Sequence, residues 1–220
     1  MGTNQEQFKK AFYSDGFNLG MEAIQSGLTQ DSMFRAIEKM YMAIDNLIDT
    51  LTNYAKQQGQ SIDCKKGCDW CCHQPIFALS YEMEYLNAFV KNNFDGKSQE
   101  EIRLRAERKN NKLKSLSETE LLNSKIVCPL LENGSCITYK ARPMACRIYI
   151  SSDVNTCLKF YKNPENKNSI PALLDFPLMA GKMMNEGFKA AIKTGGLTTA
   201  EFRIEEILLV PPVKLSCLTN

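Results

Sequence analysis

The chain has 220 residues, of which 44% are apolar and 24% are charged, and this composition predicts a globular protein rather than a disordered one. Its 27 Lys and Arg residues are nearly balanced by 25 Asp and Glu, so the net charge of +2 favours neither DNA nor a membrane surface. No stretch approaches the ~18 apolar residues of a membrane span, and the first residues lack a signal-peptide pattern. We therefore expect a cytoplasmic protein that binds neither nucleic acid nor membrane.

The first 60 residues predict two helices. Spaced aromatic residues between positions 5 and 26 indicate a first helix, which Gly16 and Gly20 should weaken. From Asp31, the expected N-cap, apolar residues recur at intervals of three and four as far as position 55. This pattern predicts a long helix whose single apolar stripe faces the core of a helical bundle.

Capping signals place further helices after position 80. Ser80 is expected to begin one helix, and Ser98 with Glu101 forms a capping box for the next. This second helix mixes many Lys and Arg with Glu, which indicates a solvated face rather than a nucleic-acid patch. Ser117 with Glu120 is a capping box for a short helix that follows.

The last third of the chain is expected to begin without regular structure and to end in helices. Residues 128–157 contain prolines and a glycine and predict an irregular segment, with a short extended stretch from Cys146 to Ile150. A helix is predicted from Leu178 to Lys193, and Thr198 with Glu201 predicts the start of another.

The cysteines are clustered rather than scattered. Nine are present, and eight of them lie between positions 64 and 157. The eight are Cys64, Cys68, Cys71, Cys72, Cys128, Cys136, Cys146 and Cys157. Because the cytoplasm keeps thiols reduced, such a cluster indicates metal or redox chemistry rather than a disulfide framework.

The first four cysteines follow the spacing C-x3-C-x2-C-C, and Gly67 gives their loop the freedom to fold the thiols inward. Thiolates suit zinc or an iron–sulfur cluster, and both normally take four protein ligands. Neighbouring side chains point in different directions, so one of Cys71 and Cys72 can serve a second site. The cysteines could form two four-thiolate sites, or one cluster with a spare thiol pair, and the sequence leaves both arrangements open. Cys157 and Cys217 are expected to be small apolar packing residues.

A second segment contains Cys128-Pro129, then Gly134-Ser135-Cys136-Ile137 with Tyr139, then Arg142-Pro143-Met144-Ala145-Cys146-Arg147. Together the two segments resemble the YkgJ-like cysteine-cluster family, the zinc- or iron-chelating CxxCxxCC domain. That family combines a C-x(2,3)-C-x2-C-C segment with C-P, a G-x-C segment with a Tyr, and R-P-x-x-C-R. The resemblance implies a metal centre built from both segments. A domain of this kind also occurs in flagellin lysine N-methylases, which leaves an iron–sulfur enzyme open.

The residues assigned to the metal are Cys64, Cys68, Cys71, Cys72, Cys128, Cys136 and Cys146. Zinc or an oxidised [4Fe-4S] cluster with four thiolates carries a formal charge of about −2, so nearby cations should stabilise it. Arg142 and Arg147, which flank Pro143, are expected to contact the cofactor, and Tyr139 to donate a hydrogen bond to a sulfur or to pack beside it. His73, the only histidine, is either a further ligand or a bystander.

The sequence therefore predicts a mainly α protein, in which one helical domain over residues 1–220 surrounds an irregular cysteine-rich metal-binding centre. The metal-chelating core spans residues 64–147, and helices flank it over 1–60 and 164–220. The predicted function is metal binding, with an iron–sulfur cluster (4Fe-4S) or zinc as the cofactor. The alternatives are an iron–sulfur-dependent oxidoreductase or protein-modifying enzyme, and a metal sensing or delivery protein that acts with a protein partner.

Overall fold

The computed structural model describes residues 2–210, and most of this part of the chain is helical, as predicted. The longer helices are α1 (Gly2–Gln25), α2 (Gln30–Gln57), α3 (Ser80–Asn93), α4 (Gly96–Leu113) and α8 (Asp175–Thr194). The shorter helices are α5 (Glu118–Asn123), α6 (Met144–Arg147), α7 (Val154–Lys162) and α9 (Ile204–Ile207), with 3₁₀ turns η1 (Trp70–His73) and η2 (Tyr139–Ala141). Strand β1 (Phe77–Leu79) pairs antiparallel with β4 (Glu201–Arg203), and β2 (Leu131–Glu132) pairs antiparallel with β3 (Ser135–Cys136).

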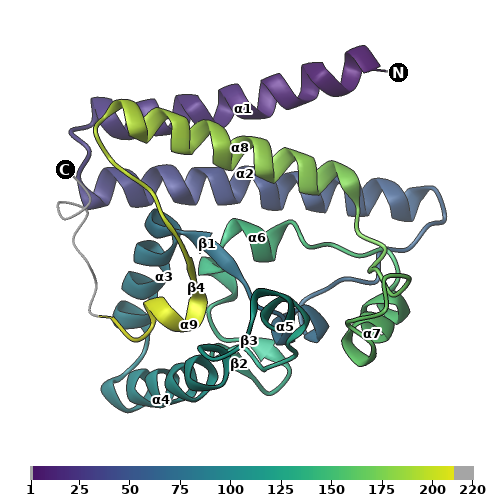
Figure 1. The fold of residues 1–220 in the computed structure, drawn as a ribbon. Coiled ribbons are helices and arrows are strands. Elements are labelled where there is room, and N and C mark those ends of the chain that lie inside the picture. The colour runs from purple at the N-terminus through teal and green to yellow at the C-terminus, as the bar shows by residue number, and fades with distance from the viewer. Residues whose placement is uncertain (1, 211–220) are drawn as a thin grey trace.

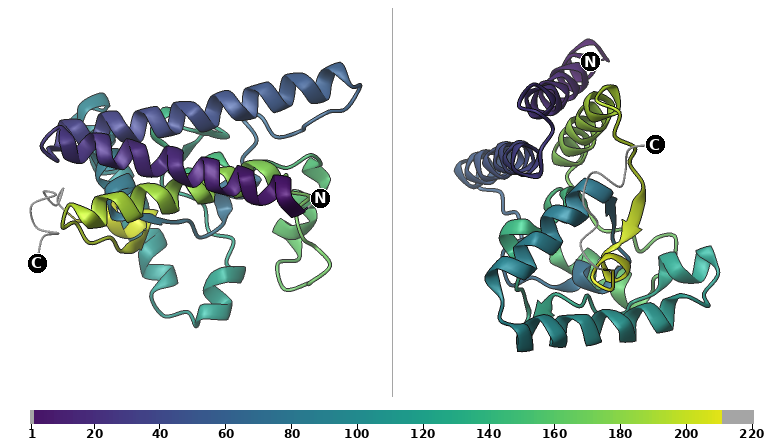
Figure 2. Two further views of the ribbon diagram at one scale, coloured as in Figure 1. Left: turned by 90° about the horizontal axis from the view of Figure 1, so that it is seen from above. Right: turned by 90° about the vertical axis from the view of Figure 1, so that its left-hand side faces the viewer.

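The described elements divide into two parts. Helices α1, α2 and α8 form a three-helix bundle, and α1 lies on the side farthest from the rest of the chain (Figure 1). The other elements, from η1 to α7 together with β4 and α9, form a second part that we call the cysteine lobe (Figure 2). The bundle therefore packs along one side of the cysteine lobe.

Glycines set the distance between α1 and α8. A Cβ atom on Gly16 would overlap the backbone carbonyl of Met184, and one on Gly187 would overlap the backbone carbonyl of Tyr13. The first helix predicted from the sequence is present, and α1 continues through Gly16 and Gly20 without a break. Glycine is required there because the two helix backbones touch.

The apolar stripe expected on the second helix is confirmed in its first half. Ile37, Tyr41 and Ile44 are buried in the bundle core, where they meet α8 residues such as Phe188. Beyond residue 45 the stripe is only half-buried, because this end of α2 extends over the cysteine lobe. Ile48 and its neighbours are thus available to line a cavity.

Several helices begin earlier than predicted, among them α2, α4 and α8, which begins at Asp175 rather than Leu178. Two polar caps explain the starts of α2 and α4. Thr29, rather than Asp31, is the N-cap of α2, and its side chain accepts a hydrogen bond from the Ser32 backbone. Asp95, rather than Ser98, caps α4. In both cases the residue predicted as the N-cap lies within the first turn of the helix. A polar residue in the first turn is hard to tell from a true N-cap by sequence alone, because helix ends are located only to within one or two residues.

Three local predictions in the last third are wrong. The stretch expected to be extended at Cys146 begins within α6, and residues 154–162 form α7, which was not anticipated. Thr198 does not start a helix, because β4 follows and pairs with β1 before the single turn of α9. Pairing with a strand more than a hundred residues away overrides the local capping signal.

A second apolar core lies inside the cysteine lobe. Its buried residues come from α3, α4, α9 and the segment after Cys128, and include Met83, Leu86, Ile102 and Ile204. The lobe therefore has a small core of its own beneath the bundle. Within residues 2–210, no helix combines the length with the apolar character that crossing a bilayer requires.

Candidate metal centre

The first cysteine segment leaves α2 and folds through a tight turn. Gly67 has a φ of +94°, and the Cys68 backbone donates a hydrogen bond of 3.0 Å to the carbonyl of Lys65. The 3₁₀ turn η1 follows and carries the adjacent pair Cys71 and Cys72. The positive φ explains why a glycine lies between the first two cysteines.

The second cysteine segment is joined to the first by a backbone hydrogen bond. The Cys128 amide donates to the Cys72 carbonyl at 2.7 Å. The β2–β3 hairpin then brings Cys136 beside Leu131. Its turn residues, Asn133 and Gly134, both have positive φ, as a type I′ turn requires. An Asn-Gly pair between short strands is the sequence signal from which this hairpin could have been predicted.

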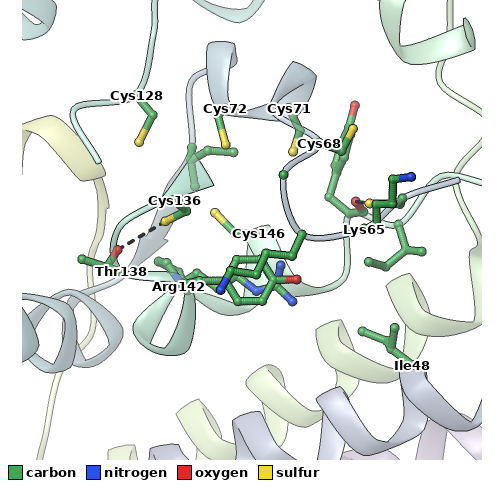
Figure 3. A pocket seen from close by; sticks show the side chains of 18 of the residues that line it. Ile48, Lys65, Cys68, Cys71, Cys72, Cys128, Cys136, Thr138, Arg142 and Cys146 are labelled. Atoms are coloured by element: carbon green, nitrogen blue, oxygen red, sulfur yellow. Dashed lines mark hydrogen bonds between the residues drawn. The ribbon is translucent and has the colours of Figure 1, made fainter. Parts of the chain in front are cut away.

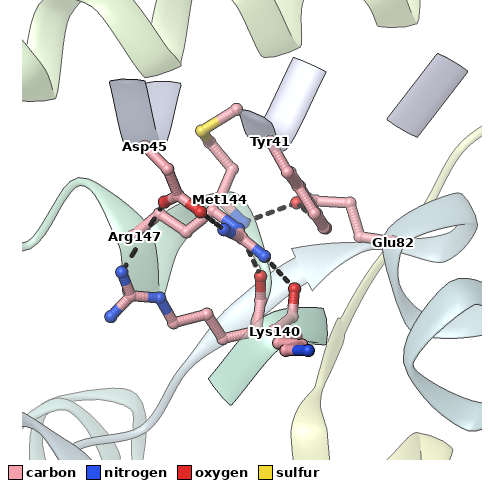
Figure 4. A network of polar contacts seen from close by, with 7 residues as sticks. Tyr41, Asp45, Glu82, Lys140, Met144 and Arg147 are labelled. Carbon is pink, nitrogen blue, oxygen red and sulfur yellow. Dashed lines mark hydrogen bonds and ion pairs between the residues drawn. The ribbon is translucent and has the colours of Figure 1, made fainter. Parts of the chain in front are cut away.

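A buried carboxylate holds the helix that carries the last predicted ligand. Glu82 is 1% exposed, and its Oε1 accepts hydrogen bonds from the Tyr41 hydroxyl at 2.9 Å and from the Met144 amide at 2.7 Å (Figure 4). Its Oε2 accepts from the Leu79 amide and the Asn185 side chain, both at 3.2 Å. Glu82 thus fixes the start of α6 to α2, α3 and α8. Sequence reasoning missed this residue.

Arg147 holds α6 from its other end. It is 1% exposed, and its guanidinium donates to the carbonyl of Arg142 at 2.9 Å and also to the Lys140 carbonyl and the Asp45 carboxylate. The group lies 4.0 Å from the centre of the Tyr41 ring (Figure 4). Arg147 does not line the cysteine cavity. Its contacts position the chain on either side of Cys146 rather than face the sulfurs.

The seven cysteines assigned to the metal all line one cavity of about 430 Å³. None of the eight described cysteines forms a disulfide. Figure 3 shows the cysteines of η1 opposite those of the second segment, with the sulfurs of Cys72, Cys128, Cys136 and Cys146 around a common space. We call these four the inner cysteines. They are also the ones that pack with the apolar core of the lobe.

The remaining four described cysteines lie together around a separate small hollow. Cys64, Cys68, Cys71 and Cys157, which we call the outer cysteines, line a small hollow of about 10 Å³. Cys157 belongs to α7 and was expected to be a packing residue. Cys217, expected to pack in the same way, lies outside the described residues.

In residues 2–210, no three Cys, His, Asp or Glu side chains converge closely enough to hold one ion as they stand. For these thiols to hold one ion, their side chains must first turn about the Cα–Cβ bonds into other staggered positions. Thiols that share a cavity wall can do this, whereas thiols on opposite faces of a fold cannot.

Burial raises the pKa of several thiols. The pKa of Cys64 and that of Cys128 are each about 11, mainly because of desolvation. Burial, and next the nearby thiols of Cys128 and Cys71, raise the pKa of Cys146 well above its ordinary value. These groups are neutral at pH 7 in the metal-free protein, so a metal ion must displace their protons to bind.

Cys71 differs from the other thiols. A hydrogen bond from the Cys72 thiol lowers the pKa of Cys71, and the Arg142 guanidinium lowers it further, while the same hydrogen bond raises the pKa of Cys72. Arg142 lies 3.9 Å above the Tyr139 ring and 3.7 Å from the Asp45 carboxylate. Arg142 and Tyr139 both line the cavity, in the place where the sequence expects them.

Lys109 provides a second positive charge near the inner cysteines. It is 4% exposed, its ammonium lies 3.7 Å from the Glu205 carboxylate and 3.5 Å from the Gln74 carbonyl, and its charge counteracts the raised pKa of Cys128. Sequence reasoning grouped it with the solvated residues of the basic helix. Lys109 lies at helical spacing from the buried residues Ile102 and Ala106, and this spacing is the sequence signal from which its burial could have been predicted.

Helix α2 supplies a polar wall that sequence reasoning also missed. Asp45, Asp49 and Thr52 line the cavity opposite the cysteines, together with Ile48. His73 lines neither cavity. Its Nδ1 lies 3.1 Å from the Asp69 carbonyl oxygen, to which it can only donate, and its ring packs against a tyrosine of α7.

The comparisons with known proteins assign this chain to no family. Models of protein families, curated proteins and solved structures were compared with it, and none matches. The resemblance to the YkgJ-like family therefore rests on the cysteine motifs alone.

Proposed function

We propose that the protein binds metal through the thiolates that line the cavity, either as zinc or as an iron–sulfur cluster, in the cytoplasm, where thiols stay reduced. The observation that carries the proposal is that cysteines from two segments, separated by more than fifty residues, share one cavity. Thiols placed for packing alone would have no reason to gather from both segments at the same empty space.

The inner cysteines are the best candidates for the principal ligands. Cys72 lies in η1, Cys128 in the loop before β2, Cys136 at the end of β3 and Cys146 in α6. The Cys128–Cys72 backbone hydrogen bond and Glu82 hold these segments in place. Four thiolates form the usual ligand set of structural zinc and of a [4Fe-4S] cluster. Their apolar surroundings would keep water away from a bound group.

Charge supports the same ligand set. A tetrathiolate centre carries a formal charge of about −2, and an isolated buried charge of that size is costly. Arg142 on one side of the cavity and Lys109 behind Cys128 offset it. The two cations explain why acidic partners such as Asp45 and Glu205 are tolerated beside the thiols.

The motif resemblance also supports metal binding. Every cysteine of the family's pattern lies on the cavity wall, as does Arg142 of the R-P-x-x-C-R segment. The family is associated with zinc or iron, and either fits the donor set present here.

Anaerobic purification followed by zinc, iron and acid-labile sulfide analysis tests the proposal. We expect Cys128→Ser to lower the metal content, because it removes a buried inner ligand. The control is Cys217→Ser, the same chemical change at a cysteine outside both motifs, which should leave the metal content unchanged. Equal metal in the wild type and both variants, or no metal in any of them, contradicts the proposal.

The size and lining of the cavity favour a second candidate, an iron–sulfur enzyme. A volume of about 430 Å³ exceeds what one metal ion needs and falls in the range of small-molecule sites, which is roughly 300–1,000 Å³. Asp49 and Thr52 offer polar contacts opposite the sulfurs. A brown, oxygen-sensitive sample with iron and sulfide in about equal amounts supports this candidate, and a colourless sample that contains zinc alone contradicts it.

A further inference from the structure

Cys157 was expected to be a packing residue, but the structure places it with three cysteines of the first motif. Helix α7 docks against the first cysteine segment through its N-terminal end. The Val154 amide donates to the Asp63 carboxylate at 3.1 Å, and the Cys64 amide donates to the Ser151 carbonyl at 3.2 Å. The start of α7 is therefore fixed beside Cys64.

A second contact fixes the rotation of α7. Tyr161 packs its ring against Trp70 and His73 of η1, with centroid separations of 5.2 Å and 5.0 Å. Residues four apart lie on the same face of a helix, so Cys157 faces η1 one turn before Tyr161. The thiol of Cys157 is thus directed at the segment that carries Cys68.

The hollow between these elements has the size of a single ion. Its volume is about 10 Å³, and its wall includes all four outer cysteines with Trp70, Tyr149 and Val154. A void of about 10–15 Å³ holds one water-sized occupant. A cluster of four irons does not fit there, whereas one ion with four thiolates, at metal–sulfur distances of about 2.3 Å, suits such a space once the side chains close on it.

The outer and inner cysteines differ in what surrounds them. Cys64, Cys68 and Cys71 line both the large cavity and the small hollow, whereas the inner cysteines line only the cavity and Cys157 lines only the hollow. The inner cysteines pack with the apolar core of the lobe, and the outer ones do not belong to that core. Of the adjacent residues Cys71 and Cys72, only Cys71 lines the hollow, so Cys71 is assigned to the outer group.

We propose that Cys64, Cys68, Cys71 and Cys157 form a second thiolate site, which binds a single divalent ion such as zinc. The protein then has two metal centres, one built from the inner and one from the outer cysteines. This inference rests on the proposed function in one respect, namely that thiolates of this region bind metal. It adds Cys157 as a ligand, a residue that neither cysteine motif contains. The outer site would join α7 to the loop that follows α2.

Titration of the reduced, metal-free protein with Co²⁺, followed by thiolate-to-cobalt charge-transfer absorption and native mass spectrometry, tests the second site. We expect two metal equivalents for the wild type and for Cys217→Ser. Cys157→Ser should bind one equivalent, and Cys136→Ser should also bind one, because each variant loses a different site. The Cys157→Ser, Cys136→Ser double variant should lose both.

Two results would overturn the inference. If Cys157→Ser binds as much cobalt as the wild type while Cys136→Ser binds less, the inner site stands and the outer site does not exist. If the wild type binds no cobalt, the proposed function fails together with this inference. Circular dichroism of each variant guards against misfolding, and Cys157→Ala, which preserves a small apolar side chain, should lose the same equivalent as Cys157→Ser if the thiol is a ligand.

Discussion

In the bundle, α1 and α8 approach so closely that only glycine fits at Gly16 and Gly187, and a continuous apolar core lies between the three helices. In the cysteine lobe, only α3 and α4 among the elements between η1 and α7 are longer than six residues, and cysteine thiols line a cavity inside the lobe. Helix packing alone can stabilise the first arrangement. The short elements of the second form few extended packing surfaces, so we expect its stability to depend on what the thiols bind. Four predictions test this difference.

Metal removal should have the largest effect, and the effect should be confined to the lobe. Structural zinc contributes about 10–16 kcal/mol of apparent binding free energy in small zinc-dependent peptides, so loss of the metal should cost the lobe several kcal/mol. We expect a strong chelator to speed hydrogen exchange at the Cys128 and Ile137 amides by at least ~100-fold. Amides of α1 and α8 should change little. Uniform acceleration across both parts would show that they are one cooperative unit.

Gly187→Ala should destabilise the bundle without removing metal. The added Cβ would overlap the Tyr13 carbonyl, so α1 and α8 must separate. Overpacking of this kind costs about 1–3 kcal/mol, and the upper end applies here because backbone atoms cannot move aside as a side chain can. Chemical denaturation measures the loss. Gly96→Ala is the matched control, because nothing lies within 4 Å of its Cβ position, and it should change stability by less than about 1 kcal/mol.

Glu82→Ala should weaken the junction between the two parts. The change leaves the Tyr41 hydroxyl and the Met144 amide without their buried acceptor, and hydrogen bonds to a charged group contribute about 1.5–3 kcal/mol. We expect a loss of about 2–3 kcal/mol in unfolding free energy and weaker metal retention, because α6 carries Cys146. Glu38→Ala removes an exposed carboxylate that accepts from Tyr85, and it should cost less than about 1 kcal/mol. Equal losses for the two variants would contradict the role given to Glu82.

Glu84 should make stability depend on pH. Burial raises the pKa of its carboxyl from 4.5 to about 7, and no hydrogen-bond partner for it is present among residues 2–210. The folded protein therefore holds the Glu84 proton more tightly than the unfolded chain does. The contribution of the protonated carboxyl to the free energy of unfolding is complete below pH 4.5 and is lost as the pH rises through 7. We expect Glu84→Gln to be more stable than the wild type above pH 7, by about 2 kcal/mol, and the difference to vanish near pH 4. Unfolding free energies of both proteins across this pH range measure it, and a difference that does not vary with pH would contradict the assignment.

The helices that could be predicted from the sequence are those with a long apolar period or a clear capping box. The stripe through Ile37, Tyr41 and Ile44 predicts α2, and Ser117 with Glu120 caps α5 as expected. Short elements were missed or misplaced, because a single turn such as α6 has too few residues for a period to be visible.

The candidate ligands show the same division. The spacing of the first four cysteines, and the motif that ends at Arg147, identify the thiols and predict that both segments meet. The positions of Lys109 and Cys157 could not be predicted in this way. Each is ordinary in its local sequence, and it becomes relevant only because a distant element brings it beside the thiols.

By itself, the sequence determined that this protein is mainly helical and that it concentrates soft ligands in two segments, because both properties are local and follow from residue type and spacing. Tertiary structure alone decided that thiols from both segments share one cavity, that Cys157 lies beside three of them at a small hollow, and that Arg147 supports the chain instead of facing the sulfurs. The physical reason is that such choices depend on contacts such as the Cys128–Cys72 hydrogen bond, which joins residues far apart along the chain and leaves no trace in their spacing.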